Sequence, residues 1–436
     1  MKIVFWRFRI SRSLLVTCLF ITVVILKMAE NKSGNQPIED AVPSDNQSEQ
    51  TLQLVDISSM GIMDIKLDMR NSRIEIPEQT NYPTSLASRS AATAHDEDKL
   101  ITILLWNPFF TNEDYYFGIG HQPFVDNECR VQTCRTTRDH SFLNEATAIV
   151  IHGPRVDEPL PPYRPQGQLY AYVQAEPHYN GSKTYLPTMG DMFNITMTNR
   201  RDSDVYIAYG VVVPSKTAAR SRGDAFVSPL NKPKSVVWAV SHCNTPGRRE
   251  RYVVELRKHI EVDVYGACGT LACPKSDECM DMFTREYKFY LSLENHYCKD
   301  YVSEKLYRTL EYDIIPIVFG GADYTKDAPP HSVINILDYP RPKDLADYLD
   351  YLSSNETAYN EYFEWKKHYF IEHFRHVIYG GVFCRLCEIL HDPDYRYRNY
   401  TDLYSWWVDG MCDPNVIGRM ARKYNWFEEN IKFPIQ

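Results

Sequence analysis

The chain has 436 residues, of which 44% are hydrophobic and 24% are charged, and its formal net charge is −9. At about 100 to 200 residues per domain, this length predicts two or three domains, and the composition excludes a disordered chain and a small disulfide-rich protein. The negative charge argues against a dedicated nucleic-acid binder, because neutralising phosphates requires clustered lysine and arginine. The 11 cysteines could indicate metal sites, catalysis or disulfides.

An uncharged apolar run covers residues 13–26, with four basic residues before it and Lys27 after it. Fourteen helical residues span about 21 Å, which is short for a bilayer core of about 30 Å, and a cleaved signal peptide has a similar length. No small-residue cleavage site follows, so we expect a transmembrane signal anchor at 13–27. The basic residues favour a cytoplasmic tail at 1–12 and a lumenal location for the rest of the chain.

Residues 28–98 are rich in Asn, Ser, Gln, Glu and Pro without sustained apolar periodicity, which indicates a flexible stem. Residues 1–27 carry five basic groups and no acidic one, so the lumenal part has 43 basic and 57 acidic side chains. N-x-Ser/Thr sequons, which matter only in a secretory compartment, give the glycosylation candidates Asn31, Asn46, Asn180, Asn194, Asn355 and Asn399.

With Cys18 in the anchor, ten cysteines remain in an oxidising compartment, an even number that is typical of structural disulfides. Cys129 and Cys134 could close a small loop. Cys384 and Cys387 form the only CxxC, and because no second CxxC or paired histidines follow at zinc-finger spacing, a disulfide or mixed pairing is favoured over zinc. These four cysteines are the disulfide candidates, with their connectivity left open, and no metal site is predicted.

From residue 99 onward, strand-like apolar runs alternate with helical patterns, which is typical of the α/β class. After the run that ends at Asn107, the expected strands are 148–152, 169–173, 205–209, 235–243, 262–265, 288–294, 314–319 and 332–336. The expected helices of the second half are 248–259, 301–312 and 342–352. A Pro-rich linker at 229–233 divides the series into two Rossmann-like lobes, 99–230 and 231–436, which we expect to face a cleft.

The motifs of P-loop, dinucleotide-binding, zincin and nucleophile-elbow enzymes are absent from the sequence. Cationic residues instead stand where strands lead into helices. Arg248 and Arg249 occupy one such junction, and Ser303-Glu304-Lys305 occupies another. Helix N-termini favour anions, so this placement suits a diphosphate, although a solvated helix face would contain the same residue types.

The segment YKFYLSLENHYCKDYVSEKLYRTLEYDIIPIVFGG, residues 287–321, closely resembles the donor-binding signature of the alpha-1,3-fucosyltransferases. Four upstream segments resemble the same family in the same order: TILLWNPFF, CRVQTCRTTRD, FNITMTNRRDSDVYIAYG and VVWAVSHCNTPGRRERYVVELRKHIEVDVYGACG. Together they extend the resemblance from about residue 99 to the C-terminus.

The resemblance implies a single-pass type II enzyme of the Golgi membrane with GT-B architecture, in which 99–230 bind the acceptor and 231–436 bind GDP-fucose. Such an enzyme transfers L-fucose with inversion to a GlcNAc of a glycoprotein N-glycan, and the core or antennal position of that GlcNAc stays open. No cofactor is required, although a divalent cation could stimulate the reaction.

By motif position, the resemblance assigns Arg248 and Lys305 to the donor diphosphate, Asn295 and Tyr301 to the donor pocket, and Glu304 to the ribose hydroxyls. A carboxylate can accept hydrogen bonds from two hydroxyls, and two cations can neutralise the charge that develops on a leaving diphosphate.

Inversion by single displacement requires one general base. In the family this is a glutamate, usually in a Glu-Ser-Pro element, and here Glu176 directly precedes Pro177 without the serine. Glu158 and Asp191 are weaker candidates, and a surface carboxylate in a Pro-rich loop is the plain alternative. His242 stands where the family commonly has Asn.

The Asp202-Ser203-Asp204 triplet supports a rival hypothesis, a metal-dependent transferase of another sugar, although DxD occurs easily by chance and recurs at 392–394. A second rival is a catalytically inactive, glycan-binding paralogue. A glycosidase is a weaker option, because it requires two carboxylates that flank one bond.

Overall fold

The computed structural model describes residues 100–153, 159–177, 186–215, 228–273, 277–373, 380–398, 400 and 402–426. All of them belong to one compact unit, Gln79–Gln436. The expected tail, anchor and stem lie outside the described residues, as do the sequons at Asn31, Asn46, Asn180 and Asn399. No helix within the described ranges has the length and apolar character of a membrane span.

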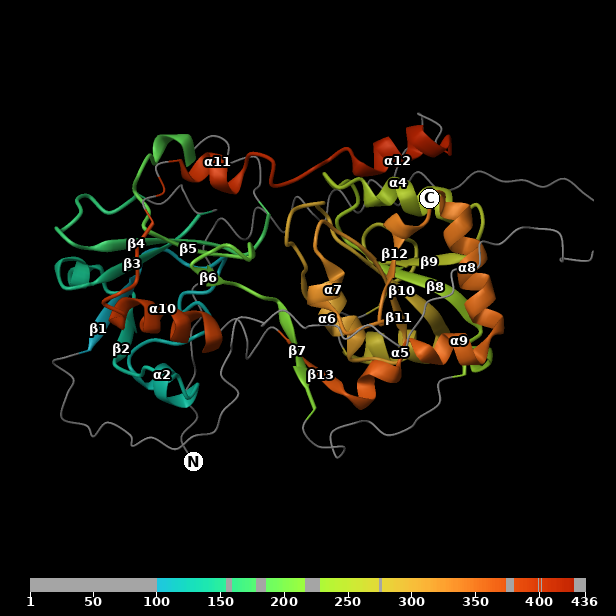
Figure 1. Cartoon of the computed structure of the whole chain (residues 1–436), viewed down its shortest axis with the longest axis horizontal. Coiled ribbons are helices and arrows are strands. Elements are labelled where there is room, and N and C mark those ends of the chain that lie inside the picture. Colours follow the sequence, from blue (N-terminus) through green and yellow to red (C-terminus); the bar gives the residue numbers. More distant parts are fainter. Residues whose placement is uncertain are drawn as a thin grey trace, which may run out of the picture. The chain divides into compact units, whose positions relative to one another are not determined.

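The first sheet has six parallel strands in the order β2-β1-β3-β4-β5-β6 (Figure 1). Its strands are β1 (Ile101–Leu105), β2 (Cys134–Thr137), β3 (Ala148–His152), β4 (Leu169–Gln174), β5 (Ile195–Thr198) and β6 (Val205–Tyr206). All residues of β3 and β5 are buried. Such continuous burial is expected of parallel strands that are covered on both faces.

The second sheet has five parallel strands in the order β12-β11-β10-β8-β9. Its strands are β8 (Lys234–Ala239), β9 (Val262–Tyr265), β10 (Tyr287–Leu293), β11 (Ile315–Phe319) and β12 (Ile334–Asn335). The helices of this region are α4 (Arg249–Leu256), α5 (Asp277–Glu286), α6 (Glu304–Leu310), α7 (Tyr324–Asp327), α8 (Pro342–Ser354) and α9 (Glu356–Glu361). The predicted α/β class with two Rossmann-like sheets is confirmed.

The two sheets share one strand order. Numbered from its own first strand, the second sheet follows 2-1-3-4-5, and the first sheet follows the same order with a sixth strand at its end. The direction of winding therefore reverses between β1 and β3 and again between β8 and β10. In sheets of this type, ligands bind beyond the carboxyl ends of the strands at the reversal. The fold therefore offers two such positions, one beyond Leu105 and His152 and the other beyond Ala239 and Leu293.

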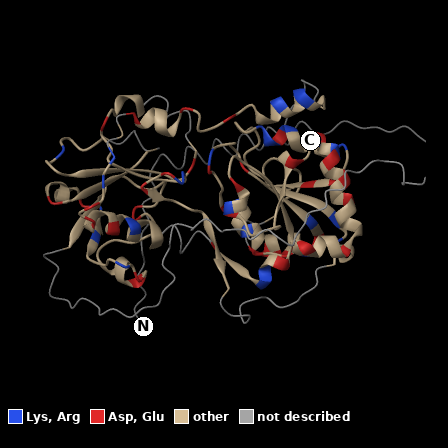
Figure 2. Cartoon of the chain, viewed as in Figure 1, with Lys and Arg blue, Asp and Glu red and all other residues tan. Residues whose placement is uncertain are grey.

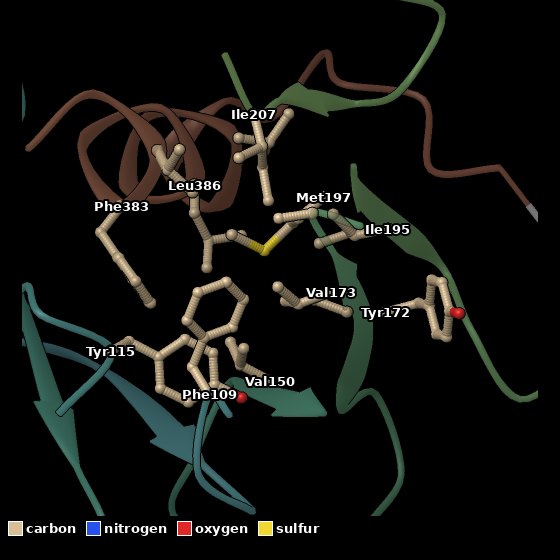
Figure 3. Close-up of a cluster of buried hydrophobic side chains, with 14 of the residues drawn as sticks. Phe109, Tyr115, Val150, Tyr172, Val173, Ile195, Met197, Ile207, Phe383 and Leu386 are labelled. Carbon is tan, nitrogen blue, oxygen red and sulfur yellow. The ribbon is translucent and has the colours of Figure 1, made fainter. Parts of the chain in front are cut away.

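The C-terminal part of the chain returns to the first sheet. Two antiparallel strands, β7 (Gly210–Pro214) and β13 (Tyr369–His373), pair where the chain leaves the first sheet and where it comes back. After them come α10 (Val382–His391), α11 (Leu403–Trp407) and α12 (Val416–Tyr424). Phe383 and Leu386 of α10 point into the core beside Val150 and Met197 (Figure 3). Within the predicted second lobe, 231–436, the apolar face of α10 thus completes the first core, whereas α12 packs on α4 in the second core.

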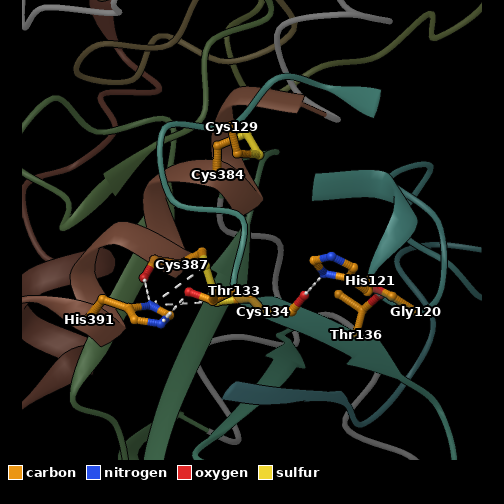
Figure 4. The surroundings of a disulfide bond; sticks show 9 residues. All are labelled: Gly120, His121, Cys129, Thr133, Cys134, Thr136, Cys384, Cys387 and His391. Carbon is orange, nitrogen blue, oxygen red and sulfur yellow. Dashed lines mark hydrogen bonds between the residues drawn. A yellow bond between two sulfur atoms is a disulfide. The ribbon is translucent and has the colours of Figure 1, made fainter. Parts of the chain in front are cut away.

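All ten cysteines after residue 27 form disulfides, which confirms the prediction that they are structural. The pairs are Cys129–Cys384, Cys134–Cys387, Cys243–Cys268, Cys273–Cys279 and Cys298–Cys412. The small loop suggested for Cys129 and Cys134 is not formed, because each is bonded to a cysteine of α10 (Figure 4). The CxxC of α10 therefore has the mixed pairing, and its two bonds fasten the returning segment to the first sheet.

His391 lies beside the Cys134–Cys387 disulfide, and the ligand atoms of these three residues lie within 4.8 Å of one another (Figure 4). The cluster does not supply a zinc site, because a metal requires thiolates and both sulfurs are bonded to each other.

Candidate functional site

The reversal in the second sheet brings together the residues that the sequence singled out. The loop after β8 leads to Arg248 and α4, and the loop after β10 leads to Ser303 and α6. The two loops are joined by a hydrogen bond of 2.8 Å from the Gly247 N–H to the Asn295 carbonyl. A Cβ at Gly247 would lie 2.9 Å from that carbonyl oxygen, so glycine permits the close approach. Arg248 and Asn295 are therefore held side by side.

Arg248 has left-handed backbone geometry, with φ of 56°, at the N-cap of α4. A residue with a side chain rarely adopts this conformation, which costs about 1 to 3 kcal/mol and is concentrated at functional sites. The Arg248 side chain is half-buried at a helix N-terminus, where backbone N–H groups already favour an anion.

The neighbouring Arg249 has a different role. It is only 4% exposed, and its guanidinium donates to the carbonyl oxygens of Leu293 and His242. Burial lowers the pKa of Arg249, although Glu294 and Glu250 oppose that shift. Arg249 thus supports the ends of the two strands, and Arg248 is the arginine available to a ligand. His242, where the family commonly has Asn, contributes its carbonyl to this support.

A buried carboxylate stands at the end of β10. Glu294 is 1% exposed and accepts hydrogen bonds from the Ser303 N–H and hydroxyl, both at 2.8 Å to Oε1. Its Oε2 lies 3.2 Å from Lys305 Nζ. Burial raises the pKa of Glu294, and the ammonium of Lys305 opposes the shift. The sequence reasoning missed this residue, although an acidic side chain at the end of the apolar run KFYLSL was a usable signal.

Lys305 and Glu304 begin α6, which Ser303 caps through its side chain. Burial lowers the pKa of Lys305, but the charges of Glu294, Glu304 and Glu176 outweigh burial and raise it overall. Glu304 is half-exposed and approaches Lys305 Nζ at 3.4 Å. The junction therefore presents a charged ammonium and a solvent-accessible carboxylate.

Asn295 has a half-buried side chain, and within the described part of the chain its Oδ1 is buried and has no hydrogen-bond partner. Orphaned buried acceptors are rare in folded proteins and require a partner. A donor group of a ligand would satisfy this oxygen.

Glu176, which follows β4 of the first sheet, contacts Tyr301, which lies in the segment between β10 and α6 of the second sheet. The hydroxyl of Tyr301 donates to its Oε2 at 2.7 Å, and the hydroxyl of Tyr209 donates to its Oε1 at 2.9 Å. Tyr301 is fully buried; burial raises its pKa well above the usual range, and the charge of Glu176 adds to the shift. Both phenols therefore stay protonated and hold the carboxylate in place. Tyr301, expected in the donor pocket, directs its hydroxyl to the candidate base.

The alternative carboxylates lie elsewhere. Asp191 is exposed on a turn, and Glu158 lies outside the described residues. Asp204 accepts hydrogen bonds from Tyr395 at 2.6 Å and from Tyr400 at 2.7 Å, while Asp202 pairs with Arg200 at 2.6 Å. The Asp-Ser-Asp triplet thus ties the β5–β6 turn to the returning C-terminal segment, and its side chains are engaged by protein partners.

Two sequons lie in the described part of the chain. Asn194 Oδ1 accepts a hydrogen bond from the Tyr170 N–H at 3.1 Å, and Asn355 Oδ1 accepts one from the Ala358 N–H at 3.1 Å as the N-cap of α9. Their glycosylation stays a prediction.

Comparisons with known proteins identify the family. "Glycosyltransferase family 10 (fucosyltransferase) C-term" matches residues 229–406, and "Fucosyltransferase, N-terminal" matches residues 98–210. The chain belongs to the fucosyltransferases of glycosyltransferase family 10. It is therefore a glycosyltransferase, and the resemblance noted in the sequence is confirmed. The C-terminal family model covers the second sheet of this fucosyltransferase, and the N-terminal model covers its first sheet.

Relatives of this fucosyltransferase carry different names. It is 37% identical to Alpha-(1,3)-fucosyltransferase C of Drosophila melanogaster over 71% of its own length and 78% of the relative's. It is 32% identical to Glycoprotein 3-alpha-L-fucosyltransferase A of the same species over 77% and 67% of the two chains. It resembles a crystal structure of an alpha1,3-fucosyltransferase with GDP, with a TM-score of 0.48, 16% identity and coverage of 72% and 96%.

Proposed function

We propose that this fucosyltransferase transfers L-fucose from GDP-fucose, with inversion, to the 3-hydroxyl of a GlcNAc on a glycoprotein N-glycan. The observation that carries the proposal is the contact between Glu176 and Tyr301 at 2.7 Å, because it joins a carboxylate of the first sheet to the segment that contains Glu304 and Lys305. The names of relatives as alpha-1,3-fucosyltransferases support the reaction.

The donor would bind beyond β8 and β10. Arg248 and Lys305 each stand at a helix start, where side-chain cation and backbone N–H groups together suit the two phosphates. Glu304 is exposed enough to accept hydrogen bonds from two ribose hydroxyls. Asn295 Oδ1, which is buried without a partner among the described residues, would accept a hydrogen bond from the donor.

Glu176 would act as the general base. Each of its oxygens accepts one hydrogen bond from a tyrosine, and a carboxylate oxygen has a second lone pair for the proton of the acceptor hydroxyl. As the acceptor oxygen bonds to the anomeric carbon from the face opposite the leaving group, the bond to GDP breaks. Arg248 and Lys305 then stabilise the charge on the departing diphosphate. These cations supply what a metal supplies in other transferases, so we propose that no cofactor is required, although a divalent cation could stimulate.

We also propose that the enzyme works in the Golgi lumen as a single-pass type II membrane protein. Five disulfides in the described residues support an oxidising compartment, where such bonds form and persist. The apolar run at 13–26 supports the anchor.

Substitution of Glu176 tests the mechanism. In Glu176→Gln we expect calorimetric GDP affinity to stay within about twofold of the wild type, while turnover of GDP-fucose falls by about 10²- to 10⁴-fold, the usual contribution of a general base. Asp191→Asn serves as the control and should keep full activity. Turnover in Glu176→Gln equal to that of the wild type would exclude Glu176 as the base.

The same assay separates the remaining alternatives. Full activity in EDTA is expected, and loss of activity that returns with added metal would support a metal-dependent transferase. Mass spectrometry of products formed on defined core and antennal glycans identifies the acceptor GlcNAc. A protein that binds GDP but modifies none of these glycans would be an inactive, glycan-binding relative.

A further inference from the structure

Both oxygens of the Glu294 carboxylate contact residues at the start of α6. The Glu294 backbone N–H donates to the Phe319 carbonyl at 2.8 Å, which fixes the residue between β10 and β11. Ser303 donates to Oε1 through its N–H and to both carboxylate oxygens through its hydroxyl, at 2.8 and 2.9 Å. Lys305 approaches Oε2 at 3.2 Å. No part of this carboxylate faces solvent, since the residue is 1% exposed.

A buried carboxylate is costly unless it is paired and hydrogen-bonded, so Glu294 is unlike an incidental surface charge. Its satisfied hydrogen bonds leave it no capacity to recognise a donor directly. The ammonium of Lys305, by contrast, belongs to a side chain that is 28% exposed. Glu294 can therefore affect a ligand through Lys305.

The three protons of Lys305 Nζ have three partners at increasing distance. Ser303 Oγ lies at 2.8 Å, Glu294 Oε2 at 3.2 Å and Glu304 Oε1 at 3.4 Å. The first two partners are buried, whereas the Glu304 side chain is 50% exposed. A phosphate oxygen that approaches from solvent would replace Glu304 at the ammonium and leave that carboxylate to the ribose hydroxyls.

We propose that Glu294 is a positioning residue that keeps Lys305 protonated and aimed at the donor diphosphate, with Ser303 as the bridge between them. The inference rests on the proposed function, because it assumes that Lys305 binds the donor. It explains why a carboxylate, which repels phosphate, is buried beside an anion site: its charge sustains the cation that the phosphate requires.

The charges around Lys305 define the expected pH dependence. Glu294 approaches from β10, Glu304 from α6, Glu176 from β4 and Arg249 from α4. Burial favours the neutral amine, and the Glu294 carboxylate is the largest influence that opposes burial. Without that carboxylate, Lys305 should lose its proton at lower pH.

Glu294→Gln tests the proposal through the KM for GDP-fucose between pH 6 and 8.5. At pH 6, where Lys305 is charged in both proteins, the ratio of variant KM to wild-type KM should be about one or lower, because a repelling charge has been removed. The ratio should rise toward pH 8.5 as the amine begins to deprotonate, because the Glu294 charge no longer opposes the burial that favours the neutral amine. A change in packing alone would raise KM equally at every pH, and that result would overturn the proposal.

A rescue variant and a matched control sharpen the test. Lys305→Arg added to Glu294→Gln should make the KM ratio independent of pH, because a guanidinium stays protonated. Glu255 is also buried and pairs with Lys258 at 2.9 Å, but it lies on α4 away from this cluster. Glu255→Gln should therefore leave the KM profile unchanged. A pH-dependent ratio that persists with Lys305→Arg would contradict the assignment.

Two further measurements cover the cases in which Glu294→Gln does not fold or its KM ratio does not change with pH. Should Glu294→Gln not fold, Ser303→Ala removes the bridging hydroxyl together with the side-chain cap of α6, and it should give the same rise in KM with pH, at smaller amplitude. Calorimetry of the wild type with GDP separates the two levels of the proposal. Absence of GDP binding would refute the proposed function, whereas GDP binding with a pH-independent KM ratio would refute the role of Glu294 alone.

Discussion

The two sheets share one strand order but present different chemistry where that order reverses. Beyond β1 and β3 the first sheet presents amide and aromatic groups, and its one cation at the end of β1 in the described residues, Arg138, is paired with Glu113. Asn107 exchanges two hydrogen bonds with the backbone of His152, at 2.8 and 2.9 Å, and the rings of Phe109 and Phe110 pack on the His152 ring. Beyond β8 and β10 the second sheet is charged, with Arg248, Glu294 and Lys305. Charged residues are also frequent on the helices around the second sheet (Figure 2).

The strand order of a sheet decides where a ligand can bind, and the side chains at that place decide which ligand binds. Topology places a ligand position at both reversals, because loops diverge there and leave the strand ends uncovered. Side chains then select the ligand class: cations and helix N-termini suit a diphosphate, whereas rings and amides suit the apolar faces and hydroxyls of a sugar. Removing charge from the second reversal should therefore impair donor binding, while damage to the first should affect stability.

Among these variants, the largest effect on donor binding is expected for Arg248→Gly. Loss of a charge-assisted contact of about 1.5 to 3 kcal/mol should raise the KM for GDP-fucose by about 10- to 100-fold. Stability should be unchanged or up to about 1 kcal/mol higher, because glycine adopts the left-handed conformation of this position without strain. Steady-state kinetics and urea unfolding measure the two quantities.

Arg257→Gly is the matched control at the other end of α4. Arg257 has ordinary right-handed geometry, with φ of −61°, so glycine should cost about 0.5 to 1 kcal/mol there and leave KM unchanged. If both variants lost the same stability and neither changed KM, the strained geometry of Arg248 would have no functional meaning.

The first reversal should respond in the opposite way. Asn107→Ala leaves a buried N–H and a buried carbonyl of His152 without their amide partner, which should cost about 2 to 4 kcal/mol in the free energy of unfolding. GDP affinity, measured by calorimetry, should stay within about twofold of the wild type. Asn107→Asp keeps the acceptor for the His152 N–H but turns a second oxygen toward the His152 carbonyl, so it should lose at least as much stability. A large drop in GDP affinity with intact stability would break the division between the two sheets.

Much of this arrangement could be predicted from the sequence because the evidence is local. The strands 148–152 and 262–265 are found at their expected bounds, since each is a short apolar run between clear turns. Arg248, Glu304 and Lys305 lie at helix starts as expected, because a strand followed by a turn and polar residues specifies that junction.

The rest depends on contacts between distant parts of the chain. Cys129 and Cys384 are separated by 255 residues, and no spacing rule identifies such partners. The apolar face of α10 predicts burial but not which sheet it covers. Similarly, nothing in the sequence around Tyr301 shows that its hydroxyl reaches Glu176, because that contact requires both sheets to be folded.

The last prediction concerns two lysines of the second sheet, Lys305 and the buried Lys232, and it tests whether a charge there serves donor binding or is only tolerated by the fold. Lys305, at the carboxyl edge, has carboxylate partners that raise its pKa. Lys232, just before β8, is 6% exposed and donates to the Asp313 carbonyl oxygen, with Lys366 and Lys288 nearby. Burial lowers the pKa of Lys232 to about 7; Asp313 opposes that shift, and Lys366 and Lys288 add to it.

The sign of the stability change follows from that shift. Because the unfolded chain holds this proton more tightly, stability is lowest below about pH 7 and rises as the pH approaches 10.5, at about 1.4 kcal/mol for each pKa unit. Lys232→Met should lack this increase, so between pH 7 and 9.5 the wild type should gain about 2 to 3 kcal/mol on the variant in urea unfolding. Lys234→Met, which removes the partner of Asp263 at 3.1 Å, should show no such change in that window, because pairing raises the pKa of Lys234. If the stability of the wild type and of Lys232→Met changed with pH in parallel, the Lys232 ammonium would have to reach solvent. The two lysines would then differ only in that Lys305 belongs to the proposed donor site.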